Sequence, residues 1–108
     1  MRIRFAKKSD IWLLYNWVNK IDSIKNKLIT NKKISKTDHK IWYENSLKNR
    51  NRYIWIIENK HIAIGQLRFD INEDKKLCFI DIYIDEEHRK NNFGQNAINK
   101  AIDFIILK

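Results

Sequence analysis

Apolar residues near the C-terminal end of the chain follow two different periods. In the first segment they occupy every second position, as on one face of a β-strand, and they are Cys78, Ile80, Ile82 and Ile84. In the second segment, which follows Gly94, they recur at helical spacing, and they are Ala97, Ile98, Ala101, Ile102 and Ile105. The pattern therefore predicts a strand with one buried face, a short polar turn and a helix.

The polar turn between this strand and this helix runs from Arg89 to Gly94. The first backbone N–H groups of a helix have no partners within the helix and attract anions such as phosphate. Arg89 and Lys90 add positive charge, and Gly94 permits a close approach of the backbone or a positive φ. The turn is therefore a candidate phosphate site, although it also fits an ordinary turn with a solvated basic pair.

A short strand and a helix are predicted at the start of the chain. Ile3 and Phe5 alternate with arginines, which is typical of a strand. Ser9 is expected to cap the helix that follows. Trp12 and Trp17 fall near the margins of its apolar side, where packing is favoured over stacking on nucleic-acid bases. The apolar side itself consists of Ile11, Leu14, Tyr15, Val18 and Ile21.

A second helix is predicted after Ser35. The segment Ser35–Asp38 is a variant of the capping box. The lysine-rich residues 20–36 before it predict a helix tail and an extended loop, and they form either a solvated basic surface or a phosphate-attracting wall beside a substrate cleft. One face of the second helix is expected to carry His39, Trp42, Tyr43 and Leu47.

Residues 53–71 predict a β-hairpin. Asn59–Lys60 suits a two-residue turn between its strands, and Gly65 is expected to mark a bulge or a close backbone approach. On the returning strand, one face is expected to hold Ala63, Gly65, Leu67, Phe69 and Ile71, and the other Ile62, Ile64, Gln66, Arg68 and Asp70. The polar residues on the second face indicate that one end of the strand meets water or a ligand. Residues 72–75 then form the turn into the next strand.

The predicted order is β, α, α, β, β, β, α, and 108 residues provide for one small α/β domain over residues 1–108 with a mostly antiparallel sheet. Lysine and arginine number 22 against 13 acidic residues, so the net charge is +9 and polyanionic ligands are favoured. A small basic nucleic-acid-binding module is therefore one candidate class. No RNP, KH or helix-turn-helix signature supports that class.

Several other classes are disfavoured by composition. The single cysteine, Cys78, excludes a disulfide framework, and its place on the apolar face of a strand predicts a buried thiol. His39, His61 and His88 have no ligand spacing, so no metal site is expected. The sequence has neither an apolar run long enough for a membrane span nor a signal peptide, so the cytoplasm is the expected location.

The segment Ile82–Gly94 resembles the acetyl-CoA motif of the GCN5-related N-acetyltransferases (GNATs). In that family the fourth strand is followed by a loop of the form Arg/Gln-x-x-Gly-x-Gly/Ala and then by a helix. Arg89 takes the first motif position and Gly94 the last. Asn92 stands where the family usually has its first glycine, and asparagine tolerates the left-handed region better than most residues. The order of elements also matches the family through its third helix.

The resemblance implies transfer of an acetyl group from acetyl-CoA to an amine, with no metal. Main-chain groups of Ile82, Tyr83 and Ile84 would bind the pantetheine arm. The turn would hold the pyrophosphate, and with Arg89 its residues are Lys90, Asn91, Asn92, Phe93, Gly94 and Gln95. A protonated amine cannot attack, so a base or a water chain must remove a proton. Asp81 is the candidate base, because a half-buried carboxylate beside Tyr83 is expected to have a raised pKa.

Two further segments resemble a subgroup that acetylates nucleotide-linked amino sugars, as in the pseudaminic and legionaminic acid pathways. The run His39-x-x-Trp42-Tyr43 is similar to its second helix, and Ile64–Asp70 to its third strand. Trp17-Val-Asn is similar to its Trp-Arg-Asn triplet. The resemblance implies acceptor contacts from His39, Trp42, Arg68 and Trp17, although His39 also suits a packing or capping role. A UDP-linked amino sugar is the expected acceptor, and a protein N-terminal amine, as in ribosomal-protein acetyltransferases, is the alternative.

The chain is expected to be a truncated member of this family. After the last predicted helix, a complete GNAT continues with further strands and another helix that complete the cofactor cleft. The apolar stripe of that last helix is therefore expected to be uncovered on one side. A C-terminal partner segment, a homo-oligomer or an inactive remnant are the corresponding interpretations.

Overall fold

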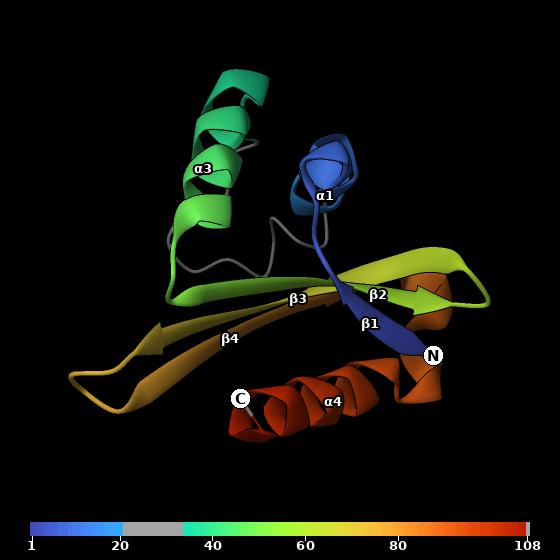
Figure 1. The fold of residues 1–108 in the computed structure, drawn as a ribbon. Coiled ribbons are helices and arrows are strands. Elements are labelled where there is room, and N and C mark those ends of the chain that lie inside the picture. Colours follow the sequence, from blue (N-terminus) through green and yellow to red (C-terminus); the bar gives the residue numbers. More distant parts are fainter. Residues whose placement is uncertain (21–33, 108) are drawn as a thin grey trace. The chain divides into compact units, whose positions relative to one another are not determined.

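A computed structural model describes residues 1–20 and 34–107 (Figure 1). The chain divides into two compact units. The sheet unit comprises Met1–Ala6 and Asn51–Lys108, and the helical unit comprises Lys7–Arg50. Most of the predicted loop at residues 20–36, and Ile21 with it, lies outside the described residues.

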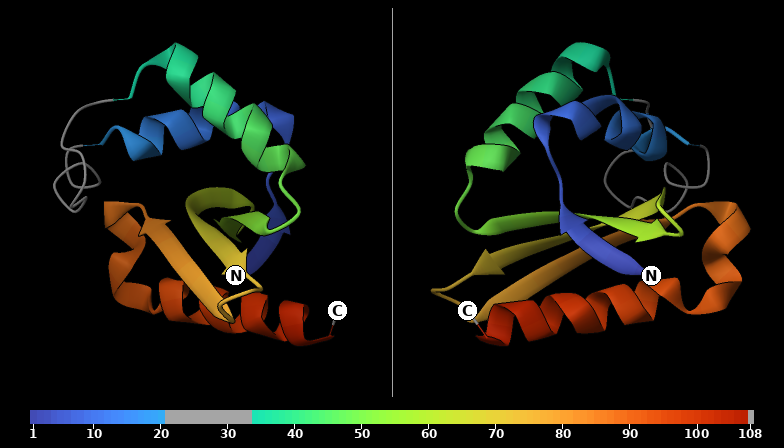
Figure 2. Two further views of the ribbon diagram at one scale, coloured as in Figure 1. Left: turned by 90° about the vertical axis from the view of Figure 1, so that its left-hand side faces the viewer. Right: turned by 45° about the vertical axis from the view of Figure 1, so that its right-hand side comes forward.

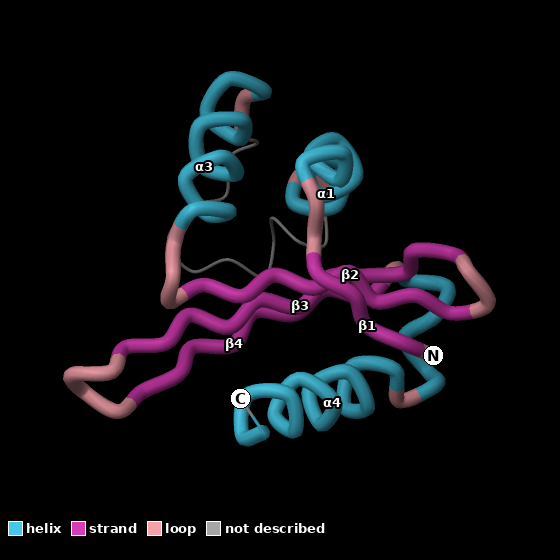
Figure 3. The backbone as a smooth tube through the Cα atoms, viewed as in Figure 1, coloured by secondary structure: helices cyan, strands magenta, loops and turns pink. Residues whose placement is uncertain are grey.

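The sheet unit contains the four predicted strands. They form one antiparallel sheet in the order β1-β2-β3-β4, drawn in magenta in Figure 3. Their bounds are β1 Arg2–Phe5, β2 Arg52–Asn59, β3 Ile62–Asn72 and β4 Leu77–Ile84. Each neighbouring pair is antiparallel, and both described edges of the sheet, β1 and β4, have a strand on one side only.

The β2–β3 turn differs from the predicted one by one residue. Asn59 still pairs with Ile62, so the turn residues are Lys60 and His61 rather than Asn59 and Lys60. Both turn residues have positive φ, 53° and 67°. Positive φ at both central positions is the conformation of a type I′ turn, whose twist matches that of the strands it joins.

A bulge near Gly65 changes which side chains enter the core. Ile57 pairs with Gly65 and Glu58 with Ala63, so Ile64 is an extra residue in β3. The bulge that Gly65 was expected to mark is therefore present. The predicted alternation placed Ile64 on the same face of the strand as Arg68. This prediction is wrong, because the extra residue shifts the pleat. Ile64 is fully buried in the core.

The helix α4, Phe93–Leu107, packs against one face of this sheet, as Figures 1 and 2 show. Ala97 and Ala101 are completely buried, and their small side chains allow the helix to approach the strands closely. The predicted stripe is thus confirmed, although Ile102 stays 39% exposed. The buried residues of this core are Trp55, Ile57, Ile64, Leu67, Phe69, Ala97 and Ala101.

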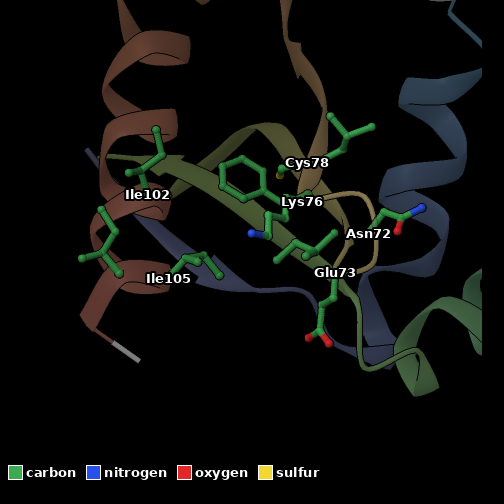
Figure 4. Close-up of a pocket in the computed structure, with 10 residues that line it drawn as sticks. Asn72, Glu73, Lys76, Cys78, Ile102 and Ile105 are labelled. Atoms are coloured by element: carbon green, nitrogen blue, oxygen red, sulfur yellow. The ribbon is translucent and has the colours of Figure 1, made fainter.

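The predicted burial of β4 is wrong for most of the strand. Ile80 is 47% exposed, Ile82 is 36% exposed and Cys78 as a residue is exposed, because β4 is an edge strand that α4 covers incompletely. An apolar pocket of about 440 Å³ therefore opens between the start of β4 and the end of α4, with Cys78, Ile102 and Ile105 among its lining residues (Figure 4). Partial burial, with the Asp70 charge, raises the pKa of the Cys78 thiol.

The helical unit contains α1, Ile11–Val18, and α3, Lys36–Lys48. Ser35 caps α3 as predicted, since its Oγ accepts the Asp38 N–H at 3.1 Å. Ser9 does not cap α1. It lies in a single 3₁₀ turn, Lys8–Asp10, in which the buried Asp10 carboxylate accepts the Lys7 N–H at 2.7 Å.

Neither these helices nor α4 is long and apolar enough to cross a membrane.

The buried side of α3 also differs from the expected one. His39, Tyr43 and Ser46 are buried, whereas Trp42 and Leu47 are exposed. These buried positions follow the i, i+4, i+7 spacing of one helical face. The Tyr43 hydroxyl donates a hydrogen bond to the Lys7 carbonyl, which ties α3 to the start of this unit.

We expect Gly65→Ala to destabilise the protein strongly, because a Cβ there would lie 2.1 Å from the Tyr83 carbonyl oxygen. Relief of that overlap requires the β3–β4 pairing to shift, which should cost about 2 kcal/mol or more. Gly94→Ala is the matched control, since its Cβ would meet the flexible tip of Ile82 at 3.3 Å and make an ordinary contact with the Ile84 side chain at 3.9 Å. Urea unfolding of the two variants measures the difference, and equal stabilities would contradict this account of Gly65.

Candidate functional site

The outer edge of β4 presents main-chain donors and acceptors. The Asp85 N–H donates to the Ile64 carbonyl at 2.7 Å, on the β3 side. Because an antiparallel ladder alternates, Tyr83 and Asp81 also face β3, where they lie opposite Gln66 and Arg68. The main-chain groups of the residues between them point away from β3, and these are Cys78, Ile80, Ile82 and Ile84. In the described part of the chain no strand pairs with this edge.

This alternation divides the three strand residues expected to bind a cofactor. The N–H and C=O groups of Ile82 and the N–H group of Ile84 face outward along the edge. The main chain of Tyr83 pairs with Gln66, so Tyr83 offers its side chain instead. The Tyr83 hydroxyl donates to the Asp85 carboxylate at 3.3 Å.

The turn after β4 brings the start of α4 next to this edge. A 3₁₀ helix, η2, spans Glu86–Asn91, and Asn92 follows in the left-handed conformation, φ 57° and ψ 21°, as its sequence position suggested. Gly94 does not have a positive φ. Its role is close packing, because a Cβ there would lie 3.3 Å from Ile82 Cδ1. The first turn of α4 therefore packs against the side chains of Ile82 and Ile84.

Arg89 contacts β4 directly. Its Nε donates to the Ile84 carbonyl at 2.7 Å, and its guanidinium carbon lies 5.4 Å from the centre of the Tyr83 ring. This carbonyl is one of the outward groups of the edge. Lys90, the next residue, is exposed.

Charged side chains cross the opposite face of the sheet in an alternating row. Arg52 Nε lies 2.6 Å from Asp70, Asp70 lies 3.2 Å from Arg68 Nε, and Arg68 Nη1 lies 3.9 Å from Asp81. Gln66 Nε2 also donates to Asp81, at 3.4 Å. The Asp81 side chain is 54% exposed, so about half of it is accessible to water, because β4 is an edge strand.

The three predicted acceptor residues of the helical unit differ in accessibility. Trp17 is 4% exposed and His39 is 3% exposed, so neither offers surface to an acceptor. His39 Nε2 donates to the Ile11 carbonyl at 2.8 Å, and its ring stacks on Tyr43. These contacts correspond to the packing role that the sequence left open for His39. Trp42 is 37% exposed and remains accessible.

Two structural supports of the site were not identified from the sequence. Asp70 holds Arg68 between Arg52 and Asp81, and the Ile84 carbonyl holds Arg89. Gln66, Arg68 and Asp70 alternate along β3, and this pattern indicated a row of polar side chains. Identifying which of them form ion pairs also required the register of β3 with β2 and β4. Within residues 1–20 and 34–107, no group of His, Cys, Asp and Glu side chains is arranged to hold a metal ion.

The fold and this geometry define a class of protein. The edge strand of an antiparallel sheet presents open main-chain groups, which suit a ligand chain that contains amides. That strand leads through the left-handed Asn92 to the start of a helix, which suits phosphates. A sequence profile of the Acetyltransferase (GNAT) family matches residues 13–106. The chain belongs to this family.

Solved structures of acetyltransferases have the same fold. Spermidine N-acetyltransferase from Vibrio cholerae, in complex with CoA and spermine, superposes with a TM-score of 0.79 at 19% identity, over 95% of this chain and 62% of that one. Ribosomal-protein-alanine N-acetyltransferase from Brucella melitensis gives 0.75 at 16%, over 95% and 65%. The chain thus spans less than two thirds of the length of either protein. A comparison with curated proteins gives no significant match.

We expect His39 to make stability depend on pH. Burial lowers its pKa below the ordinary 6.5, and the hydrogen bond to the Ile11 carbonyl only partly opposes this. The unfolded chain then binds a proton at a higher pH than the folded one, so the free energy of unfolding decreases as pH falls below about 6.5. Well above that pH, His39 is neutral in both the folded and the unfolded chain, so its titration no longer lowers the free energy of unfolding.

Urea unfolding at about pH 8 and about pH 5 measures this dependence. His39→Gln keeps an N–H donor for Ile11 but does not titrate, so its stability should change less between the two conditions. His61→Gln, at an exposed turn residue, is the matched control and should behave like the wild type. A His39→Gln variant with the full pH dependence would contradict the assignment.

Proposed function

We propose that this chain is an N-acetyltransferase that binds acetyl-CoA along the outer edge of β4 and transfers the acetyl group to a primary amine. The observation that carries the proposal is the outward N–H and C=O groups of Ile82 and the outward N–H group of Ile84, on a strand against which Gly94 of α4 packs. Outward N–H and C=O groups on a strand can pair with the amides of a pantetheine arm as a further strand would. Membership of the GNAT family supports the same ligand.

The residues of the turn fit the diphosphate of the cofactor. Asn92 has the left-handed conformation, and the first N–H groups of α4, beginning at Phe93, have no acceptors within the helix. Lys90 supplies exposed positive charge. We propose that main-chain groups from Lys90 to Gln95 hold the pyrophosphate, with Arg89 at the start of the same motif.

Bound acetyl-CoA supplies the acetyl group as a thioester. In the transfer, the amine nitrogen forms a bond to the acetyl carbon, the carbon–sulfur bond breaks, and CoA leaves as a thiolate, which becomes the thiol by taking up one proton that the nitrogen loses. Before this attack, the protonated amine must lose another proton to a base. Asp81 is the proposed acceptor of that proton, because its carboxylate is accessible to water and lies on the same strand as Ile82. Gln66 and Arg68 orient the carboxylate.

The proposed acceptor is a nucleotide-linked amino sugar. Arg68, held by Asp70, is the proposed contact in the sheet unit. Arg68 suits a phosphate or carboxylate of such a ligand. Trp17 of α1 and His39 of α3 are buried, so they are proposed as packing residues and not as acceptor contacts. A protein N-terminal amine is the second candidate, which the likeness to the ribosomal-protein-alanine enzyme favours.

We expect acetyl-CoA to stabilise the protein. A ligand at a hundred times its Kd should add about 2.7 kcal/mol to the free energy of unfolding, which thermal unfolding with and without acetyl-CoA measures. Gly94→Asp should abolish the effect, because it places a negative charge and a Cβ in the turn next to Ile82.

Asn99→Asp is the matched control, since it adds the same charge to α4 beyond the first turn, and it should retain the stabilisation. An absence of any shift in a cooperatively unfolding wild type would contradict the proposal. Salt-dependent binding to RNA by that same protein would then support the nucleic-acid-binding class.

We also expect Asp81→Asn to slow acetyl transfer about a hundredfold, because a general base of this kind typically contributes that much or more. The assay measures release of the CoA thiol with a UDP-linked amino sugar as acceptor, and with an alanine-starting peptide as the alternative. Asp103→Asn, an exposed change on α4, is the control. If Asp81→Asn keeps most of the wild-type kcat, the proton leaves through water instead.

A further inference from the structure

We propose that the side chain of Arg89 is a positioning residue that braces the end of β4, and that it does not bind the cofactor phosphates. The inference rests on the proposed function for its effect on acetyl-CoA. The brace itself is a property of the free protein. The pyrophosphate then depends on Lys90 and on main-chain groups of the turn.

The brace acts on the peptide unit that joins Ile84 to Asp85. Its carbonyl, on Ile84, accepts the Arg89 Nε hydrogen bond at 2.7 Å. Its N–H, on Asp85, donates to the Ile64 carbonyl at 2.7 Å on the opposite side of the strand. One peptide plane is therefore held from both edges, which fixes the last residue of β4 just before the chain turns into η2.

The guanidinium is held over the strand as well. Its carbon lies 5.4 Å from the centre of the Tyr83 ring, within the range of a cation–π contact. The Tyr83 hydroxyl in turn donates to Asp85. Arg89 therefore contacts the main chain of Ile84 and the ring of Tyr83. Both contacts hold its positive charge against β4.

This arrangement changes what the edge offers to a ligand. The Ile84 N–H points outward, but the adjacent Ile84 carbonyl is already occupied by Arg89. At this point the edge therefore presents a donor without a competing acceptor, and the guanidinium adds positive charge. Such an edge suits a carbonyl oxygen of an acylated pantetheine arm, whereas a free Ile84 carbonyl would repel it.

Hydrogen exchange tests the brace in the free protein. We expect Arg89→Met to lower the protection of the Asp85 amide about tenfold, because the peptide loses one of its two anchors, while the Leu67 amide in the centre of the sheet is unchanged. Lys90→Met removes the same charge from the neighbouring position and should leave Asp85 protected. Unchanged protection of Asp85 in Arg89→Met would overturn the inference, whether or not the protein binds acetyl-CoA.

NMR titrations with two ligands separate bracing from phosphate binding. S-acetylpantetheine has the acylated arm of acetyl-CoA but no diphosphate. Arg89→Met should raise the Kd of both ligands by a similar factor, about tenfold. Lys90→Met should weaken acetyl-CoA and leave S-acetylpantetheine unaffected.

The opposite pattern for Arg89→Met, with acetyl-CoA weakened and S-acetylpantetheine unchanged, would identify Arg89 as a phosphate ligand and overturn the inference. A wild-type protein that binds neither ligand would refute the proposed function. The exchange of the Asp85 amide would then decide the brace alone, so the two failures are distinguishable.

Discussion

The pairing of β3 with β4 is the interaction on which the candidate site depends. Its register pairs Gly65 with Ile84 and places it against the Tyr83 carbonyl oxygen, where no side chain larger than hydrogen fits. The same register turns the main chain of Ile82 and Ile84 away from β3 and toward the open edge. A shift by one residue would exchange the faces of β4 and direct the Tyr83 main chain outward instead. The edge, the row of charges and the brace by Arg89 would all be lost together.

The packing of α4 converts this edge into one side of a binding site. Ala97 and Ala101 bring the helix axis close to the sheet, and Gly94 continues that close approach to the end of β4. The first turn of the helix therefore begins beside Ile82. Asn92 makes the change of direction possible, because its left-handed conformation joins η2 to α4 within one residue. Packing at the buried end of the helix thus determines where its unpaired N–H groups lie.

The polar face of the sheet is organised by alternating charge. Arg68 lies between the carboxylates of Asp70 and Asp81, and Arg52 anchors the far end of the row. These groups are partly exposed, so their ion pairs contribute little to stability and mainly restrict side-chain geometry. Restricted geometry matters for Asp81, because an accessible carboxylate can accept a proton only when it is directed at the reacting amine.

Hydrophobic period, turn chemistry and capping residues determined the order of the strands and helices, the Ser35 cap and the left-handed Asn92, because these depend on neighbours in the sequence. The family resemblance identified the segment from Ile82 to Gly94. Only the tertiary structure decided which residues are accessible. The bulge at Ile64 moved that side chain into the core, the edge position of β4 exposed Cys78 and Asp81, and contacts with Ile11 and Tyr43 buried His39. Burial depends on which distant segments meet, and a local pattern does not encode that.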